Sequence, residues 1–237
     1  DKVIDIHCHI LPEMDDGPEI LETSLKMATI AAEDGIRTVI ATPHTDGIRV
    51  NSDSVRTGVD HLNRALQHHG ITLHILPGFE VPFHLITALA QKYTLAGSNY
   101  ILIEFPHMYV PGDALATIFQ LTARGFIPVI AHPERNRGVL SNPDQMEPLI
   151  EAGAHAQLTA SSITGDLGPD IQWCAHYLLR KNLVHFIATD SHSPSFRAPV
   201  LQKAHAVAVK LLGRAKADLL TTGNPEMIVA ARNQFTQ

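Results

Sequence analysis

Six short polar motifs carry residue types that bind transition metals. They are His7-x-His9, Asp16, Thr42-Pro43-His44, Gly78-Phe79-Glu80, His132-Pro133-Glu134-Arg135 and Asp190-x-His192. With Glu104 they offer nine candidate ligands, namely His7, His9, Asp16, His44, Glu80, Glu104, His132, Asp190 and His192. Imidazole and carboxylate groups are the ligands expected for zinc, manganese or iron. The set therefore predicts a metal centre.

The His7-x-His9 pair illustrates how one strand can present two ligands. Because side chains alternate across a strand, His7 and His9 lie on one side with Cys8 on the other, so the two histidines can share one ion. The pair is weak by itself, since core-facing or exposed histidines arise often at this spacing. The other motifs make the metal interpretation specific.

Nine ligands are more than one ion takes at a coordination number of about four to six. They suit two or three divalent ions held close together by bridging carboxylates. The four carboxylates of the set carry −4, so three divalent ions leave the site at about +2, which attracts a phosphate dianion. Such a cluster polarises a phosphoryl oxygen and lowers the pKa of a bound water, and this predicts hydrolysis.

Two arginines, Arg135 and Arg197, each follow a ligand motif within seven residues. A guanidinium group pairs with two phosphate oxygens at once and stays protonated. Each arginine could instead form a surface salt bridge, but its position after a ligand motif favours phosphate binding. We expect Arg135, Arg197 and His44 to be catalytic. Arg137 is close enough to Arg135 in sequence to exchange roles with it.

Other reactive residues receive different interpretations. His107 lies in a predicted loop beside the site, where it could touch the substrate or protonate a leaving group. Only one of Asp15 and Asp16 can easily face the ions, so we expect Asp15 to cap or orient a ligand. Cys174 and Arg180 have the Cys-x5-Arg spacing of the cysteine-dependent tyrosine phosphatases. No glycine lies between them to form a phosphate loop, so we interpret this spacing as a coincidence inside a helix.

Alternating apolar segments predict the elements that position these residues. Seven strands are expected at 3–6, 37–41, 72–76, 100–103, 127–131, 155–159 and 183–188. Helices are expected at 20–33, 54–67, 85–92, 114–123, 143–152, 171–180, 199–213 and 225–235. Alternating strands and helices, with strands that are apolar throughout, are typical of a parallel sheet covered by helices. We expect an α/β fold that closes as a distorted seven-stranded relative of the (β/α)8 barrel.

The motifs follow the carboxyl ends of the predicted strands, where such a barrel carries its chemistry. The strand at 155–159 offers no obvious ligand. The segments 44–53, 104–113, 133–143, 161–170 and 190–199 are irregular and predict the rim of the site.

Composition limits the class of protein. A chain of 237 residues, 45% hydrophobic and 18% charged, suits one domain over 1–237. The net charge of −6 argues against a sequence-independent nucleic-acid binder, which needs a basic face. There is no apolar stretch of the roughly 20 residues that span a membrane, and no signal-like start, so we expect a cytoplasmic protein. The two cysteines, far apart, predict free thiols.

These motifs resemble those of the polymerase and histidinol phosphatase (PHP) family. The resemblance rests on Asp5-Ile-His7-Cys-His9, Asp15-Asp16-Gly17-Pro18, Ala41-Thr42-Pro43-His44, Gly78-Phe79-Glu80, Ile103-Glu104-Phe105-Pro106, His132-Pro133-Glu134-Arg135 and Thr189-Asp190-Ser191-His192. Within the family, the Asp-Asp-Gly and His-Pro-Glu-Arg motifs are similar to those of the bacterial capsule-associated protein tyrosine phosphatases.

The resemblance implies a distorted (β/α)7 barrel with three metal ions, commonly manganese, and a bound hydroxide that attacks phosphotyrosine. Zinc or iron remains an alternative. The implied ligand sets are His7, His9, Glu80 and Asp190 for one ion, Glu80, Glu104 and His132 for a second, and Asp16, His44 and His192 for the third. Arg135 and Arg197 would bind the phosphate. The implied partner is a bacterial tyrosine autokinase that drives capsule or exopolysaccharide synthesis, and the expectation leaves room for a homo-oligomer.

Three alternatives stay open. The first is another PHP phosphoesterase, acting on a small metabolite such as histidinol phosphate or on a nucleotide. The second is an amidohydrolase, which is disfavoured because no lysine stands at a middle strand end to be carbamylated. The third is a scaffold with purely structural ions, disfavoured because structural sites usually rely on cysteine and histidine rather than on carboxylates.

Overall fold

The computed structural model describes residues 3–232 as strands and helices that alternate along the chain. The strands are β1 (Val3–Cys8), β2 (Ile36–Ala41), β3 (His74–Pro77), β4 (Glu80–Pro82), β5 (Tyr100–Glu104), β6 (Ile127–Ala131), β7 (His155–Thr159) and β8 (Phe186–Ala188). They form two sheets, with the orders β1-β2-β3 and β4-β5-β6-β7-β8. Every strand pair in these sheets is parallel. The predicted parallel α/β fold is confirmed.

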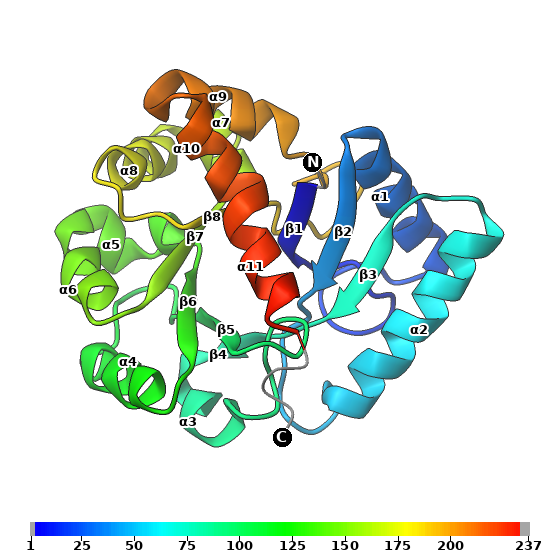
Figure 1. Cartoon of the computed structure of the whole chain (residues 1–237), viewed down its shortest axis with the longest axis horizontal. Coiled ribbons are helices and arrows are strands. Elements are labelled where there is room, and N and C mark those ends of the chain that lie inside the picture. Colours follow the sequence, from blue (N-terminus) through cyan, green and yellow to red (C-terminus); the bar gives the residue numbers. More distant parts are fainter. Residues whose placement is uncertain (1–2, 233–237) are drawn as a thin grey trace.

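Helices surround the strands in Figure 1. They are α1 (Leu21–Glu33), α2 (Ser52–His68), α3 (Ile86–Leu89), α4 (Ala114–Ala123), α5 (Arg137–Ser141), α6 (Met146–Glu151), α7 (Ala160–Thr164), α8 (Pro169–Arg180), α9 (Gln202–Leu212), α10 (Arg214–Asp218) and α11 (Asn224–Ala230). Short 3-10 turns lie at Phe83–Leu85, Pro133–Arg135 and Pro143–Gln145, and a π-helical turn at Leu219–Gly223. Within 3–232, no helix is both long and apolar enough to cross a bilayer.

All seven predicted strands are present, but β4 was not predicted. It has three residues, too few to show a hydrophobic period. The five-residue helices α5, α7 and α10 were also missed for this reason. The predicted helix at 225–235 corresponds to α11, and its last three positions lie outside the described residues.

The edges of the two sheets meet at isolated bridges rather than at full strand pairs. Cys8 bridges Ser191, and His44 bridges Glu80, both in parallel orientation. Two of the residues at these seams, His44 and Glu80, are predicted ligands. The seams therefore lie at the candidate site.

The two faces of the strands pack into two apolar clusters. In β5, Ile101 and Ile103 belong to the larger cluster, which includes helix residues, whereas Leu102 belongs to a smaller cluster with Ile4 and Ile6. Burial on both faces explains why the strands are apolar without alternation. Hydrophobic burial of this kind contributes about 25 cal/mol per Å² of apolar surface.

Helix α11 lies at the amino ends of the strands. Its Ile228 joins the smaller cluster, and Asn224 donates a hydrogen bond of 2.8 Å to the carbonyl of His185, just before β8. In Figure 1 this helix crosses in front of the strands. The opposite ends, which carry the motifs, stay clear of it.

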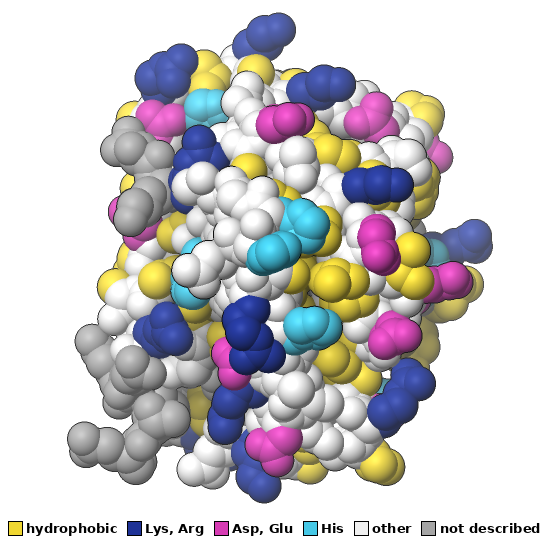
Figure 2. All heavy atoms as spheres, turned by 90° about the vertical axis from the view of Figure 1, so that its right-hand side faces the viewer, with side chains coloured by type: hydrophobic (Ala, Val, Ile, Leu, Met, Phe, Trp, Pro, Cys, Tyr) yellow, Lys and Arg dark blue, Asp and Glu magenta, His cyan; other side chains and the backbone are white. Residues whose placement is uncertain are grey.

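The face over α1 and α2 carries mixed charge. Figure 2 shows lysine and arginine side chains interspersed with acidic and histidine side chains there, without a broad basic patch. This agrees with the net charge of −6.

Candidate metal centre

The nine predicted ligands converge at the carboxyl ends of the strands. They form four overlapping groups, each with ligand atoms within 4.8 Å of one another, and the groups are His9, Asp16, His44 and His192; His7, His132 and Asp190; His7, His9 and Glu80; and His44, Glu80 and Glu104. Residues separated by as much as 185 positions in the chain thus meet in one place.

Glu80 lies at the middle of the cluster. Its fully buried Oε2 lies 3.3 Å from Nε2 of His7, 3.3 Å from Nε2 of His9 and 3.1 Å from Nδ1 of His44. Its Oε1 lies 2.8 Å from Nε2 of His132. Oε2 has no hydrogen-bond partner within the described residues, although three ring nitrogens surround it. A buried carboxylate oxygen faced by nitrogen donors in this way fits a shared divalent ion.

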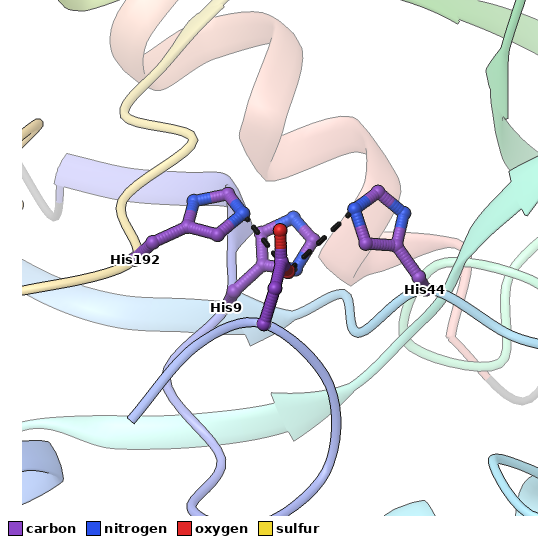
Figure 3. Close-up of side chains that lie close together, drawn as sticks. His9, His44 and His192 are labelled. Carbon is purple, nitrogen blue, oxygen red and sulfur yellow. Dashed lines mark ion pairs between the residues drawn. The ribbon is translucent and has the colours of Figure 1, made fainter. Parts of the chain in front are cut away.

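Asp16 forms the solvent-facing part of the cluster. Its Oδ1 lies 3.3 Å from Nε2 of His192 and 3.7 Å from Nε2 of His44. Its side chain is 62% exposed, whereas that of His9 is fully buried. Figure 3 shows His9 between His44 and His192, and the rings of His9 and His192 stack at 3.9 Å. The structure thus adds His9 to the group predicted for the third ion.

Glu104 is the most loosely held of the inner carboxylates. Its Oε2 lies 3.6 Å from Nδ1 of His44, and its Oε1 lies 4.0 Å from Nε2 of His132. Burial, and next the charge of Glu80, raise the pKa of Glu104. A cation placed between the two carboxylates would remove this repulsion.

Two polar residues that are not ligands orient the buried histidines. Nδ1 of His7 lies 2.8 Å from Oε1 of Gln157, and Nδ1 of His9 lies 2.6 Å from Oδ2 of Asp15. The same oxygen of Asp15 accepts the backbone N–H of His44 at 2.9 Å. Partners of this kind leave Nε2 free to face the centre. The expectation that Asp15 orients a ligand agrees with this geometry.

Gln157 was missed in the sequence. The strand at 155–159 indeed provides no ligand to the four groups, but its middle residue fixes one. Its alternation does carry a signal, because Ala156 and Leu158 join the larger apolar cluster while Gln157 and Thr159 are buried and polar. Polar residues on one face of a fully buried strand indicate a hydrogen-bonding role.

Hydrogen bonds between Asp5 and Thr189 join β1 to the residue that follows β8, next to the ligands. Asp5 Oδ1 accepts the backbone N–H of Thr189 at 2.9 Å, and the hydroxyl of Thr189 donates to Asp5 Oδ2 at 2.5 Å. The backbone N–H of His9 donates to the carbonyl of Ser191, and the backbone N–H of Asp190 donates to the carbonyl of His7, at 2.8 Å each. Burial, opposed by the bonds from Thr189, raises the pKa of Asp5 to about 6. These hydrogen bonds fix His7 relative to Asp190.

Three site residues have left-handed backbone conformations. The φ angles are 32° for His132, 50° for Asp190 and 51° for Arg197. Non-glycine residues in this region cost about 1–3 kcal/mol each, and they concentrate at functional sites. Three other described residues, Glu13, Ala96 and Asn182, also have positive φ angles but lie outside the nine candidate ligands and the two arginines.

Both predicted phosphate-binding arginines reach the cluster. Nη1 of Arg135 forms a short contact with Oδ2 of Asp190, and Nη1 of Arg197 lies 2.5 Å from the same oxygen. The structure brings Arg135, and not Arg137, to the ligands. The backbone carbonyl of His107 accepts the backbone N–H of Arg137 at 2.9 Å, and His107 and Arg137 line a cavity together with Arg135.

Charge coupling keeps the central carboxylates ionised. Burial alone would raise the pKa values of Glu80 and Asp190, but the charge of His7 and contacts with further histidines hold both well below their usual values. Burial would lower the pKa of His9, but hydrogen bonds to Asp15, Asp190 and Glu80 raise it. Anionic carboxylates are the form that binds metal.

Cys174 lies away from this chemistry. It is fully buried in α8, where burial raises the pKa of its thiol to about 12. A thiol of this kind is not a nucleophile at neutral pH. The interpretation of its Cys-x5-Arg spacing as a coincidence agrees with this burial.

The fold and the cluster define a class of α/β proteins with a histidine- and carboxylate-rich centre at the carboxyl ends of parallel strands. The sequence model of a family described as "Capsular polysaccharide synthesis, CpsB/CapC" matches residues 3–230. The chain belongs to this family. The resemblance to capsule-associated phosphatases is thereby confirmed.

Relatives cover nearly the whole chain. It is 40% identical to the tyrosine-protein phosphatase YwqE of Bacillus subtilis (strain 168), over 99% of this chain and 94% of that protein. It is 33% identical to the putative tyrosine-protein phosphatase CapC of Staphylococcus aureus, over 85% of this chain and 81% of that protein.

Solved structures resemble it as well. A crystal structure of YwqE, described with CpsB from Streptococcus pneumoniae as unique metal-dependent tyrosine phosphatases, superposes with a TM-score of 0.90 at 40% identity, covering 97% of this chain and 95% of that one. A zinc-bound histidinol phosphate phosphatase from Lactococcus lactis has a TM-score of 0.54 at 15% identity, covering 89% of this chain and 94% of that one. The latter likeness concerns the fold alone.

Proposed function

We propose that this chain is a metal-dependent protein tyrosine phosphatase. The observation that carries the proposal is that Arg135 and Arg197, from separate loops, both reach Asp190 within the cluster of nine ligands. Two guanidinium groups beside a metal cluster suit a phosphate dianion. The names of the relatives, at 40% and 33% identity, support phosphotyrosine as the substrate.

The chain's own residues have distinct roles in this proposal. Arg135 and Arg197 bind and orient the phosphoryl oxygens, and their charge stabilises the transition state. His44 and the other eight predicted ligands hold the ions, while Gln157 and Asp15 keep His7 and His9 in their ligating orientation. Bound divalent ions would polarise the phosphoryl group and supply a nucleophile from water at neutral pH.

The finer parts of the earlier predictions belong to the same proposal. They are three manganese ions, with zinc or iron as alternatives; a bacterial tyrosine autokinase as the phosphorylated partner; a cytoplasmic location; and one domain over 1–237. The two parallel sheets, bridged at Cys8–Ser191 and His44–Glu80, would together form the distorted (β/α)7 barrel.

The test combines metal analysis with substrate comparison. Purified protein should contain two or three equivalents of metal, and its turnover of a phosphotyrosyl peptide should be lost with EDTA and restored by manganese. Histidinol phosphate and nucleoside monophosphates are assayed in parallel. If either is turned over faster than the phosphotyrosyl peptide, the substrate is a small phosphoester and the proposal is wrong. Metal that raises the melting temperature without supporting any turnover would favour a scaffold.

A further inference from the structure

A cavity of about 800 Å³ opens beside Arg135. Arg135 lines it and also contacts Asp190, so the cavity adjoins the candidate centre through this side chain. The other side of the cavity is formed by the start of α8, including Trp173, whose side chain is 56% exposed. We call this cavity the Trp173 groove.

One wall of the Trp173 groove, the wall next to α5, is held by hydrogen bonds. The side-chain amide of Asn136 donates to the carbonyls of Pro106 at 2.7 Å and of Tyr109 at 2.9 Å. These bonds hold the rim segment 105–113 against α5. A Cβ on Gly138 would lie 3.1 Å from the backbone nitrogen of Val110, so glycine permits this close approach. This wall of the groove is therefore preformed, which reduces the ordering cost of binding.

The groove combines an apolar surface with an unpaired cation, Arg137, and with one exposed acidic residue, Asp170, at the start of α8. Leu140, Leu167 and Trp173 supply the apolar part. The guanidinium of Arg137 is exposed and has no hydrogen-bond or ion-pair partner among residues 3–232. A single exposed tryptophan or arginine would need no explanation. Both together, beside a residue of the centre, indicate a binding surface, because tryptophan and arginine are the side chains enriched at binding hot spots.

A second cavity continues from the other arginine. It measures about 420 Å³, is lined by Arg197 and Phe196, and shares Leu167 with the Trp173 groove. Phe196 is 63% exposed. Each of the two arginines therefore lines a cavity, and the two cavities are neighbours at Leu167. A small phosphorylated metabolite is too short to fill space on both sides of its phosphate group. A polypeptide extends on both sides of a phosphotyrosine and could occupy both cavities.

We infer that the Trp173 groove binds the polypeptide flanking the phosphotyrosine, with Arg137 pairing with an acidic side chain and Trp173 packing against an apolar or aromatic one. The inference rests on the proposed phosphatase function and specifies which substrates the enzyme prefers. Phosphotyrosyl segments with acidic neighbours should be better substrates than isolated aryl phosphates.

Kinetics of four variants test this inference. The readout is the ratio of kcat/KM for an acidic phosphotyrosyl peptide to kcat/KM for p-nitrophenyl phosphate. Arg137→Ala and Trp173→Ala should each lower this ratio about tenfold, which corresponds to about 1.4 kcal/mol. Arg64→Ala and Phe119→Ala are matched controls, since both residues are exposed on other helices; Phe119 and Trp173 are each 56% exposed.

A second peptide with neutral neighbours separates the two contacts. Arg137→Ala should abolish the preference for the acidic peptide, while Trp173→Ala should weaken both peptides equally. If the ratios of kcat/KM for both variants lie within about twofold of those of the controls, the inference that the groove binds the polypeptide is wrong, and the proposed function still stands. Hydrolysis of p-nitrophenyl phosphate without turnover of any phosphotyrosyl peptide would overturn both.

Fluorescence gives a direct measure of binding, because Trp173 is the single tryptophan of the chain. A peptide with a non-hydrolysable phosphonate in place of phosphotyrosine should shift or quench its emission saturably. Inorganic phosphate at saturation should not. An unchanged spectrum at a peptide concentration that fully inhibits the enzyme would contradict the inference.

Discussion

Oε1 of Gln157 lies 2.8 Å from Nδ1 of His7, across 150 positions of the chain. The contact leaves Nε2 of His7 facing Glu80 and Asp190 at 3.3 Å each. A residue from a strand without any ligand thus determines which nitrogen of a ligand faces the centre.

Replacing Gln157 by leucine should weaken metal binding rather than catalysis itself. The buried ring of His7 loses its orienting partner, and losses of this kind typically cost about 10–100-fold in metal affinity. Manganese titration of activity should show a higher activation constant, with near-normal turnover at saturating metal. Gln120→Leu, on the exposed face of α4, serves as the control. Equal metal affinity in the two variants would mean that the contact is only structural.

Arg135→Ala should lower kcat about 100–1000-fold, the effect of removing one charged group that stabilises the transition state. Metal content, measured by elemental analysis, should stay at the wild-type value because the guanidinium is not a ligand. Arg135→Lys should recover only part of the activity, since an ammonium group cannot pair with two oxygens at once. Loss of metal in Arg135→Ala would show that the residue holds the centre together instead.

Cys174→Ala should retain full activity, and the wild-type enzyme should resist thiol-alkylating reagents. The thiol is completely buried and its pKa is raised to about 12, so it can neither attack phosphate nor react readily. Removing the buried sulfur should cost roughly 1 kcal/mol of unfolding free energy. Loss of activity in a variant that unfolds at the wild-type urea concentration would contradict this expectation.

A histidine pair remote from the centre should make the fold acid-sensitive. The rings of His155 and His185 stack at 4.0 Å, and Nδ1 of His185 accepts the backbone N–H of Ala156 at 3.2 Å. Burial, and next the charge of His185, lower the pKa of His155 from 6.5 to about 4. Between these two values the unfolded chain binds a proton that the folded chain does not, so stability is present above pH 6.5 and falls as the pH drops toward 4.

Urea unfolding of metal-free protein at several pH values measures this loss. His155→Phe, whose ring would lie near Phe186, should flatten the pH dependence in this window. His61→Phe, on the exposed side of α2, should leave it unchanged. The same slope in wild type and His155→Phe would assign the acid sensitivity to other groups.

Local patterns were sufficient to predict most of the fold. The predicted boundaries of α4, β6 and β7 agree with the structure residue for residue, because each segment combines a clear apolar period with flanking turn residues. Strand β4 was missed because three residues hold no period, and because its first residue, Glu80, already stood out as a ligand.

The candidate ligands were readable from the sequence, and the resemblance implied most of the group around Asp16, but the place of His9 in that group was not predicted. His9 belongs with Asp16 as well as with Glu80, and this depends on how the loop after β1 folds back. Gly17 permits that return, since a Cβ there would lie 2.5 Å from the carbonyl oxygen of His9. Contacts between residues far apart in the chain, such as those of Gln157, leave no periodic signal.

The left-handed backbone at His132, Asp190 and Arg197 lowers the free energy of unfolding at positions of the candidate site. Glycine or asparagine at any of them would relax the backbone, and a screen that rewards heat resistance would enrich such changes. Each would remove an imidazole, a carboxylate or a guanidinium group from the centre. Engineering for thermostability should therefore keep these three residues unchanged and introduce stabilising substitutions elsewhere. At these positions the residue that is best for catalysis differs from the residue that is best for stability.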